Sequence, residues 1–546
     1  MSAKKQSAEG GRAGAAGPVS LPGTIGVVGA GTMGAGIAQL ACLQAEARTL
    51  LHDPMPEALA RGIEGIEHQL ERGVERERWS AEEAAAARER LEPAERLEDL
   101  AACELVIEAA PESLALKHEL YERLSAVVAP SCVLATNTSS LPVTAIASAA
   151  THPERVVGMH FFNPAPVMRL VEVIAGDASG DEAVAVARAA GEAMGKRVIV
   201  AADGPGFLVN RCGRPFGLEA LRLLGERVAS VEQVDRVCRL GGSFRMGPFE
   251  LMDLVGVDVG FDVSRSFYEL SFGEPRWRPS MITARLVAAG RHGRKAGRGY
   301  YDYRSGPHRP EDPDPPPLGG GEGRALVVAG DGVLASELRA VAAHAGYRVA
   351  ARQEPDEEPP WLILDCGAEP DDPPLQGAPQ AILCTEGSLA ALDPGGAAAG
   401  FHALPPLESS RLVELTRGPA TVDAAIERSE RLFAALGKHV EWVADAPGLV
   451  LGRIVCQLVN EAAFALREGV GSAEDIDAGM LLGLNYPHGP LHWADTIGLD
   501  HVLAVLDALA DEYREERYRA APLLRHHVWA GRFGHATGAG FFDYDP

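Results

Sequence analysis

Short apolar runs alternate with helical patterns along the first two hundred residues. Residues 24–28 form such a run, a glycine-rich turn follows, and apolar spacing then predicts a helix through Leu43. More strands are expected at residues 49–52, 105–108, 132–136 and 156–159, with helices between them. This alternation predicts a parallel, doubly wound, Rossmann-type α/β domain over residues 23–203, preceded by a disordered leader at 1–22.

Two segments interrupt or follow this pattern. Residues 57–92 are rich in Ala, Glu, Arg and Leu at helical spacing and predict a helical hairpin inserted between strands. Residues 204–304 lose the strand pattern and predict an all-helical domain. The proline- and glycine-rich residues 305–323 cannot build a packed core, so we interpret them as a linker.

The whole pattern then repeats in degenerate form. His402 follows His160 by 242 positions, and Glu414 follows Glu172 by the same 242. An offset held over about a hundred residues indicates a duplication. It predicts a degenerate Rossmann-like domain at 324–445, lacking most of the hairpin, and a second helical domain at 446–546.

Composition narrows the function classes. The 546 residues carry a net charge of −25, which argues against nucleic-acid or anionic-membrane binding. Eight scattered cysteines without a C-x-x-C pair signal no metal site and favour reduced thiols in the cytoplasm. No apolar stretch approaches 18 residues, so no membrane span is expected.

The first turn carries a dinucleotide fingerprint, Gly29-x-Gly31-x-x-Gly34, with an acidic residue, Asp53, 19 positions later. Glycine permits the tight turn and the close approach of a pyrophosphate to the helix N-terminus. Asp53 would accept hydrogen bonds from the ribose hydroxyls and repel a 2′-phosphate, which favours NAD over NADP. The alternative is a glycine-rich turn without a ligand. In the second copy Gly330-x-Gly332-x-x-Ala335 lacks the acidic residue, and we expect it to bind nothing.

Four polar residues suit the oxidation of an alcohol. Histidine side chains exchange protons near neutral pH, so His160 could accept the hydroxyl proton, while Glu172 could hold its other ring nitrogen. Ser139 and Asn210 are uncharged hydrogen-bonding residues suited to substrate oxygens. Each also has a structural interpretation: a core histidine, an exposed strand glutamate, or an Asn helix cap.

The segments that contain these residues, among them His-Phe-Phe-Asn-Pro at 160–164 and Pro-Gly-Phe-Leu-Val-Asn-Arg at 205–211, resemble the L-3-hydroxyacyl-CoA dehydrogenase family of β-oxidation. The resemblance covers residues 23–303. It implies NAD as cofactor, His160 and Glu172 as the catalytic pair, and Ser139 and Asn210 as substrate-orienting partners. It also implies cofactor contacts from Met33, Asp53, Glu112, Lys117, Ser139 and Asn163.

The family resemblance also suggests the substrate. The hairpin region meets coenzyme A in such enzymes, and Arg76 stands where a basic residue is usual; a solvated charged helix is the alternative. The two-copy architecture and residues 242–253 resemble the phenylacetate-degradation type, thought to oxidise 3-hydroxyadipyl-CoA, whereas single-copy relatives act on 3-hydroxybutyryl-CoA. A distal carboxylate would need a cation, for which Arg214 or Arg245 could serve.

The second copy keeps His402 and Glu414 but has Gly452 in place of Asn210 and Gly387 in place of Ser139. We therefore expect no dehydrogenase chemistry there. Because family members pair through the helical domain, the second copy is expected to form an internal pseudo-dimer with the first, or a homo-oligomer. Two other function classes stay open: a dehydrogenase of a free hydroxy acid or sugar acid, and a non-catalytic protein derived from an enzyme.

Overall fold

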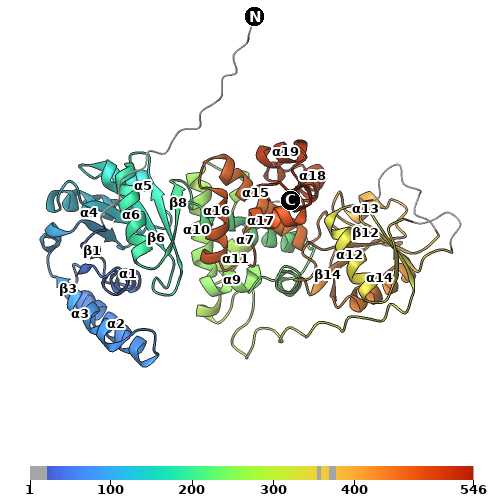
Figure 1. The fold of residues 1–546 in the computed structure, drawn as a ribbon, viewed down its shortest axis with the longest axis horizontal. Coiled ribbons are helices and arrows are strands. Elements are labelled where there is room, and N and C mark those ends of the chain that lie inside the picture. The colour runs from blue at the N-terminus through green and yellow to red at the C-terminus, as the bar shows by residue number, and fades with distance from the viewer. Residues whose placement is uncertain (1–20, 353–357, 368–376, 545–546) are drawn as a thin grey trace, which may run out of the picture. The chain divides into compact units, whose positions relative to one another are not determined.

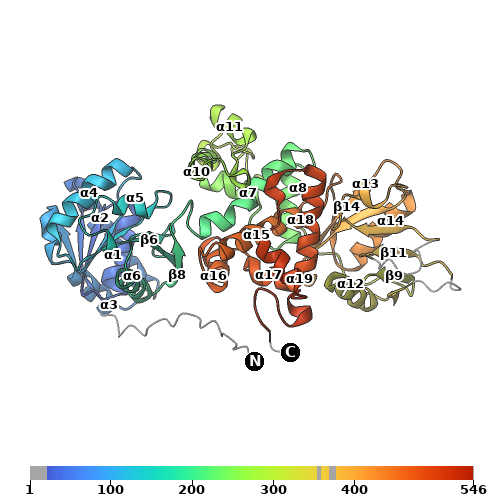
Figure 2. The same cartoon turned by 90° about the horizontal axis from the view of Figure 1, so that it is seen from above.

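The computed structural model describes residues 21–352, 358–367 and 377–544. Nearly all of the leader expected at 1–22 lies outside these residues. The chain divides into two compact units, Met1–Val198 and Ile199–Pro546. Figures 1 and 2 show the helices and strands of each unit in two views at right angles.

The first unit is built on an eight-stranded sheet with the order β3-β2-β1-β4-β5-β6-β7-β8. The strands are β1 Thr24–Val28, β2 Arg48–His52, β3 Leu91–Ala94, β4 Leu105–Glu108, β5 Val133–Thr136, β6 Val156–Phe161, β7 Leu170–Ala175 and β8 Arg197–Ala202. From β3 to β6 in this sheet order, each strand pairs in parallel with the next, as expected. The expectation of a wholly parallel sheet is wrong at one step, because β6 and β7 pair antiparallel.

Helices cover both faces of this sheet (Figure 1). They are α1 Thr32–Leu43, α2 Pro56–Glu75, α3 Ala81–Arg90, α4 Leu114–Val127, α5 Val143–Ala147 and α6 Asp181–Ala193. One continuous apolar core joins α1, α6 and the α2–α3 hairpin to the sheet. The hairpin turns at Ser80, whose hydroxyl accepts from the Glu83 amide at 3.1 Å while the Glu83 carboxylate accepts from the Ser80 amide. This capping box begins α3 abruptly and keeps α2 and α3 as separate helices.

The second unit contains two sets of helices that follow the sequence repeat. The first set is α7 Val209–Gly225, α8 Val231–Arg236, α9 Pro248–Val255, α10 Val257–Leu270 and α11 Met281–Ala288. The second set is α15 Leu451–Arg467, α16 Ala473–Gly483, α17 Pro490–Ile497, α18 Leu499–Tyr513 and α19 Pro522–Trp529. Each set has a buried aspartate on its second helix that accepts hydrogen bonds from amides at the start of its third helix. Asp235 accepts from the amides of Phe249 and Glu250, and Asp477 accepts from those of Leu491 and His492.

The two sets pack on each other through α7 and α15, with paired charges related by the same 242-residue offset. Arg211 on α7 lies 2.8 Å from Glu461 on α15. Arg453 on α15 lies 3.0 Å from Glu219 on α7. Arg453 is the equivalent of Arg211, and Glu219 is the equivalent of Glu461, so the same contact occurs twice with the two sets exchanged. Such reciprocal contacts are typical of a two-fold, isologous interface. The two helical sets therefore form an internal pseudo-dimer within one chain.

A seven-stranded sheet completes the second unit in the order β10-β9-β11-β12-β13-β14-β15. Its strands are β9 Ala325–Ala329, β10 Arg348–Ala350, β11 Leu362–Asp365, β12 Gln380–Leu383, β13 Ala399–His402, β14 Leu412–Arg417 and β15 His439–Trp442, with helices α12 Val333–His344, α13 Leu389–Leu392 and α14 Asp423–Ala435. β13 and β14 pair antiparallel, as β6 and β7 do in the first unit. The order begins at β10, where the first sheet has the additional strand β3.

Residues 305–323 contain no helix or strand, but they are held more closely than a free spacer would be. Asp312 accepts two hydrogen bonds from Arg239 at 2.9 Å, and Arg309 donates to Glu250 at 2.6 Å. At the other end, the Gly319 amide donates to Ala435. The charged residues of this segment therefore bind it to α9 and its neighbours, which its proline and glycine content alone does not predict.

Candidate active site

The turn between β1 and α1 has the geometry of a dinucleotide loop. Gly29 has a φ of +99°, and its amide donates to the His52 carbonyl at 2.8 Å. A Cβ on Gly34 would lie 1.7 Å from the Gly29 carbonyl oxygen, so only glycine allows this contact between helix and strand. A Cβ on Gly31 would meet nothing within 4 Å. The helix N-terminus therefore faces open space where the phosphates of a dinucleotide fit.

Asp53 lies at the end of β2 beside this loop. One carboxylate oxygen accepts from the Ala30 amide and the other from the Met55 amide, each at 2.9 Å. Each oxygen has a second lone pair, so both could still accept a ribose hydroxyl. These two acceptor oxygens thus fit the hydroxyls of an adenosine ribose, and the carboxylate charge opposes a 2′-phosphate.

Glu112 organises the segment after β5. A single oxygen of its carboxylate accepts from the hydroxyl of Thr138 at 2.6 Å, from the amides of Ser139 and Ser140 at 3.0 Å, and from the Ser140 hydroxyl at 2.9 Å. Burial opposes the charged form, but the hydrogen bond from Thr138 and the charge of Lys117 together hold the pKa of Glu112 below its usual value. Glu112 therefore fixes the position of Ser139, which is itself exposed.

Lys117 lies beneath this segment and is 1% exposed. Its ammonium lies 2.6 Å from Glu108, which is fully buried, and 3.5 Å from Glu112. Glu108 also accepts from the Thr136 hydroxyl at 2.7 Å. In this arrangement Lys117 supports the loop through Glu112. Sequence reasoning missed Glu108, although a glutamate closing an otherwise apolar strand was a signal of a buried ion pair.

His160 and Glu172 face each other across the antiparallel pair β6–β7. The His160 Nδ1 atom lies 2.6 Å from a Glu172 oxygen, and the two residues are 6% and 0% exposed. The ring of Phe162 lies 4.6 Å from the imidazole, centre to centre. This carboxylate fixes the orientation of the ring and can stabilise an imidazolium in a site with little water.

Three further residues expected at the site, Met33, Asn163 and Asn210, lie on different elements. Met33 is part-buried in the first turn of α1, and Asn163 is exposed just after β6. Asn210 is the second residue of α7 and belongs to the second unit. The first unit thus brings together the loop glycines with Asp53, Glu112 with Ser139 and Lys117, and His160 with Glu172.

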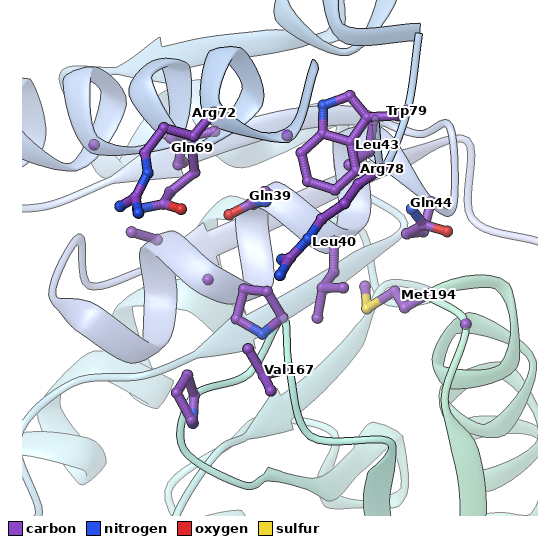
Figure 3. Close-up of a pocket in the computed structure, with 18 of the residues that line it drawn as sticks. Gln39, Leu40, Leu43, Gln44, Gln69, Arg72, Arg78, Trp79, Val167 and Met194 are labelled. Carbon is purple, nitrogen blue, oxygen red and sulfur yellow. The ribbon is translucent and has the colours of Figure 1, made fainter. Parts of the chain in front are cut away.

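A cavity of about 560 Å³ lies between α1, α2 and the segment after β6. Figure 3 shows Arg72 and Arg78 pointing toward it, with Leu43 of α1 and Val167 among its other walls. Arg76, at the end of α2, also lines it. Three arginines around a space with both apolar and amide walls form a site for an anionic ligand that also has apolar parts.

The corresponding position in the second copy is closed. His402 is fully buried, and neither ring nitrogen has a hydrogen-bond partner among the described residues. Burial, aided by the neighbouring His501, holds the pKa of His402 well below its usual value. Glu414 accepts instead from the amides of Val450 and Leu451 at the start of α15. A Cβ on Gly452 would lie 2.3 Å from the imidazole, so the ring occupies the space that a side chain at this position would need.

Comparisons with known proteins agree on one family. Residues 24–204 match the model described as 3-hydroxyacyl-CoA dehydrogenase, NAD binding domain. Residues 206–303 and 448–544 each match the model described as 3-hydroxyacyl-CoA dehydrogenase, C-terminal domain. The NAD-binding match indicates NAD as the cofactor, and the double match shows that the helical domain is duplicated.

Individual relatives cover most or half of the chain. A 3-hydroxyadipyl-CoA dehydrogenase of Escherichia coli K12 is 38% identical over 92% of this chain and 96% of its own length. A probable 3-hydroxybutyryl-CoA dehydrogenase of Bacillus subtilis is 39% identical over 51% of this chain and 96% of its own length. The crystal structure of a 3-hydroxybutyryl-CoA dehydrogenase from Escherichia coli K12 matches with a TM-score of 0.79 and 35% identity, over 93% of this chain and 98% of that one.

Among the described residues, no helix is long and apolar enough to cross a membrane. Four observations lead to one assignment: the dinucleotide loop, the His160–Glu172 pair, the family models, and a relative that is similar along nearly the whole chain. The chain belongs to the 3-hydroxyacyl-CoA dehydrogenase family of NAD-dependent oxidoreductases.

Proposed function

We propose that the protein oxidises an (S)-3-hydroxyacyl-CoA to the 3-oxoacyl-CoA at a single site, with His160 as the general base. The observation that carries the proposal is the buried 2.6 Å contact between His160 Nδ1 and Glu172. It orients a general base in a domain that also has a dinucleotide loop. When bound, NAD supplies the acceptor for the hydride that leaves C3.

The proton follows a separate path from the hydride. Because Nδ1 faces Glu172, the substrate hydroxyl proton passes to Nε2 of His160 as the C3–O bond gains double-bond character. Glu172 stabilises the imidazolium formed in this step. Ser139, positioned by Glu112, and Asn210 would donate or accept hydrogen bonds at the hydroxyl and thioester oxygens.

The arginine-lined cavity of the first unit supports coenzyme A as the carrier. Arg72, Arg76 and Arg78 offer guanidinium groups to phosphates, and the aliphatic and Trp79 walls suit an adenine. The competing function, oxidation of a free hydroxy acid or sugar acid, would leave this cavity without a role. Arg72→Gln and Arg78→Gln should raise KM for the CoA thioester while leaving kcat/KM for the corresponding pantetheine thioester unchanged within about threefold. Equal effects on both thioesters would favour the competing function.

The acyl group is a finer proposal. Two relatives that match nearly the whole chain are described with 3-hydroxyadipyl-CoA and with 3-hydroxybutyryl-CoA, respectively. We propose 3-hydroxyadipyl-CoA as the better substrate and phenylacetate catabolism as its context, supported by the first of these relatives. The eight cysteines all lie among the described residues and form no disulfide there, which also supports a reducing compartment such as the cytoplasm.

The decisive assay follows NADH absorbance with both thioesters in the wild type, His160→Gln and His402→Gln. Loss of a general base predicts a fall in kcat of roughly 10²- to 10⁴-fold for His160→Gln. Because His402 is enclosed by protein, His402→Gln should retain kcat/KM within about threefold in samples shown to be folded. No NADH from either thioester would discard the CoA assignment, and equal losses in the two variants would discard the single-site proposal.

A further inference from the structure

Arg214 is a part-buried arginine without an acidic partner. It lies on α7, where its side chain donates to the Asn210 carbonyl at 3.3 Å and to the Ser264 hydroxyl at 3.4 Å. Its guanidinium lies 4.8 Å from the centre of the Phe267 ring. Within residues 21–352, 358–367 and 377–544, no carboxylate forms an ion pair with it. Burial lowers the pKa of Arg214 to about 10, so it stays charged at neutral pH.

The nearby buried arginines, unlike Arg214, have acidic partners. Arg211, one turn earlier on α7, lies 2.8 Å from Glu461, and Arg276 lies 2.9 Å from the same carboxylate. Removing a cation from water is costly unless an anion compensates it. The neutral hydroxyl and carbonyl around Arg214 offer hydrogen bonds but no compensating charge. An anionic ligand would supply what the protein lacks at this position.

The duplicated domain shows that packing alone does not require an arginine here. The residue 242 positions after Arg214 is Cys456, and the residues equivalent to Ser264 and Phe267 are Leu506 and Leu509. All three are buried on α15 and α18, so an apolar set fills the same position in the fold. The copy that has Asn210 contains Arg214, Ser264 and Phe267. The copy that has Gly452 has apolar residues at these three positions.

We propose that Arg214 binds the distal carboxylate of the acyl chain, which makes the protein selective for dicarboxylic 3-hydroxyacyl-CoA substrates. This inference rests on the proposed function, in which Asn210 contacts the reacting end of the substrate. Residues i and i+4 on a helix have Cβ atoms about 5–6 Å apart. In a six-carbon dicarboxylic chain, three carbon–carbon bonds, roughly 4 Å when extended, separate C3 from the terminal carboxyl carbon. A chain held at Asn210 therefore reaches the guanidinium one turn further along α7.

The second copy contributes to the surroundings of this cation. The ring of Tyr486, between α16 and α17, lies 5.3 Å from that of Phe216, two residues after Arg214 on α7. Leu484 would lie 2.4 Å from a Cβ on Gly213, so glycine beside Arg214 allows the second copy to approach this closely. Arg245, the other cation considered for this role, is exposed.

The test compares two thioesters that differ only at the distal end, 3-hydroxyadipyl-CoA and 3-hydroxyhexanoyl-CoA, in wild type, Arg214→Gln and Arg214→Lys. A charge-assisted contact of the usual strength predicts a loss of roughly 10- to 150-fold in kcat/KM for the dicarboxylic substrate in Arg214→Gln. The hexanoyl substrate should change by less than about threefold, and Arg214→Lys should restore part of the selectivity. Inhibition by adipyl-CoA, but not by hexanoyl-CoA, should weaken in parallel.

Arg265→Gln is the matched control, because Arg265 lies on α10 beside Ser264 with its side chain 57% exposed, and within the described part of the chain its ion pair is with Glu269. It should leave the ratio of the two substrates unchanged. Equal losses on both substrates in Arg214→Gln would show a structural role and overturn the inference, as would a selective loss in Arg245→Gln instead. A wild type inactive on both thioesters would refute the proposed function itself, which keeps the two failures distinct.

Discussion

Gly452 in the second copy offers a direct test of whether that copy has closed its own site. A Cβ at this position would lie 2.3 Å from the His402 ring, well inside the 3.0 Å that real Cβ contacts respect. Overpacking a buried site costs about 1–3 kcal/mol. Replacing glycine by alanine in a helix returns about 0.5–1 kcal/mol. Gly452→Ala should therefore destabilise the protein by a net of about 0.5–2 kcal/mol.

The assay is urea unfolding followed by circular dichroism, with Gly217→Ala as the control. Gly217 lies inside α7 of the same unit, and its Cβ would meet only the Met252 sulfur at an ordinary 3.7 Å. Gly217→Ala should be neutral or stabilising. In a His402→Ala background the steric conflict disappears, so the cost of Gly452→Ala should fall by at least about 1 kcal/mol. The reasoning fails if Gly452→Ala matches the control in both backgrounds.

Three further predictions follow from individual contacts. Asp53→Ser removes a charged acceptor from the NAD loop and should lower the ratio of kcat/KM for NAD over NADP by about 10-fold or more, measured with both cofactors. The carboxylate form of Glu112 is stabilised by Thr138 and Lys117, so its contribution is complete above pH 4.5 and is lost as pH falls through its lowered pKa. The difference in Tm between wild type and Glu112→Gln should therefore narrow below pH 4.5, and a difference that widens there would contradict this. Arg453→Met leaves the buried Glu219 without one of its cations and should cost about 3–5 kcal/mol of unfolding free energy; a cost below about 1 kcal/mol would show that the α7–α15 charges are not coupled.

Short sequence patterns predicted these helices and strands well, because the residues that determine each of them lie close together in the chain. The glycine fingerprint and the apolar runs around it correspond to β1, α1 and β2, and the helical spacing at 57–92 corresponds to the α2–α3 hairpin. The family resemblance marked His160 and Glu172, but it did not say how two residues 12 positions apart meet. Only the antiparallel register of β6 and β7 places them directly opposite each other, and a wholly parallel sheet would not have done so.

Contacts between distant segments were beyond the sequence argument. Lys117 carries no sign in the sequence that it is buried against Glu108. The charges that join α7 to α15 are separated by more than two hundred residues, and only the repeat offset hinted that they are equivalent. The same holds for residues 305–323, whose composition indicates a spacer while Arg309 and Asp312 bind the helical domain.

The two parts of the duplicated copy are under different physical constraints. Arg453 is fully buried and held by Glu219, so losing either partner would leave an uncompensated charge in the core of the second unit. The helical part must therefore keep its charges to keep the interface. The fold does not require His402 and Glu414 to pair with each other. Glu414 caps α15, and the neutral His402 ring fills the space beside Gly452. The residues equivalent to the proposed catalytic pair thus serve as a helix cap and a packing residue without loss of the fold, while the second helical set still packs on α7, the helix that contains Asn210 and Arg214.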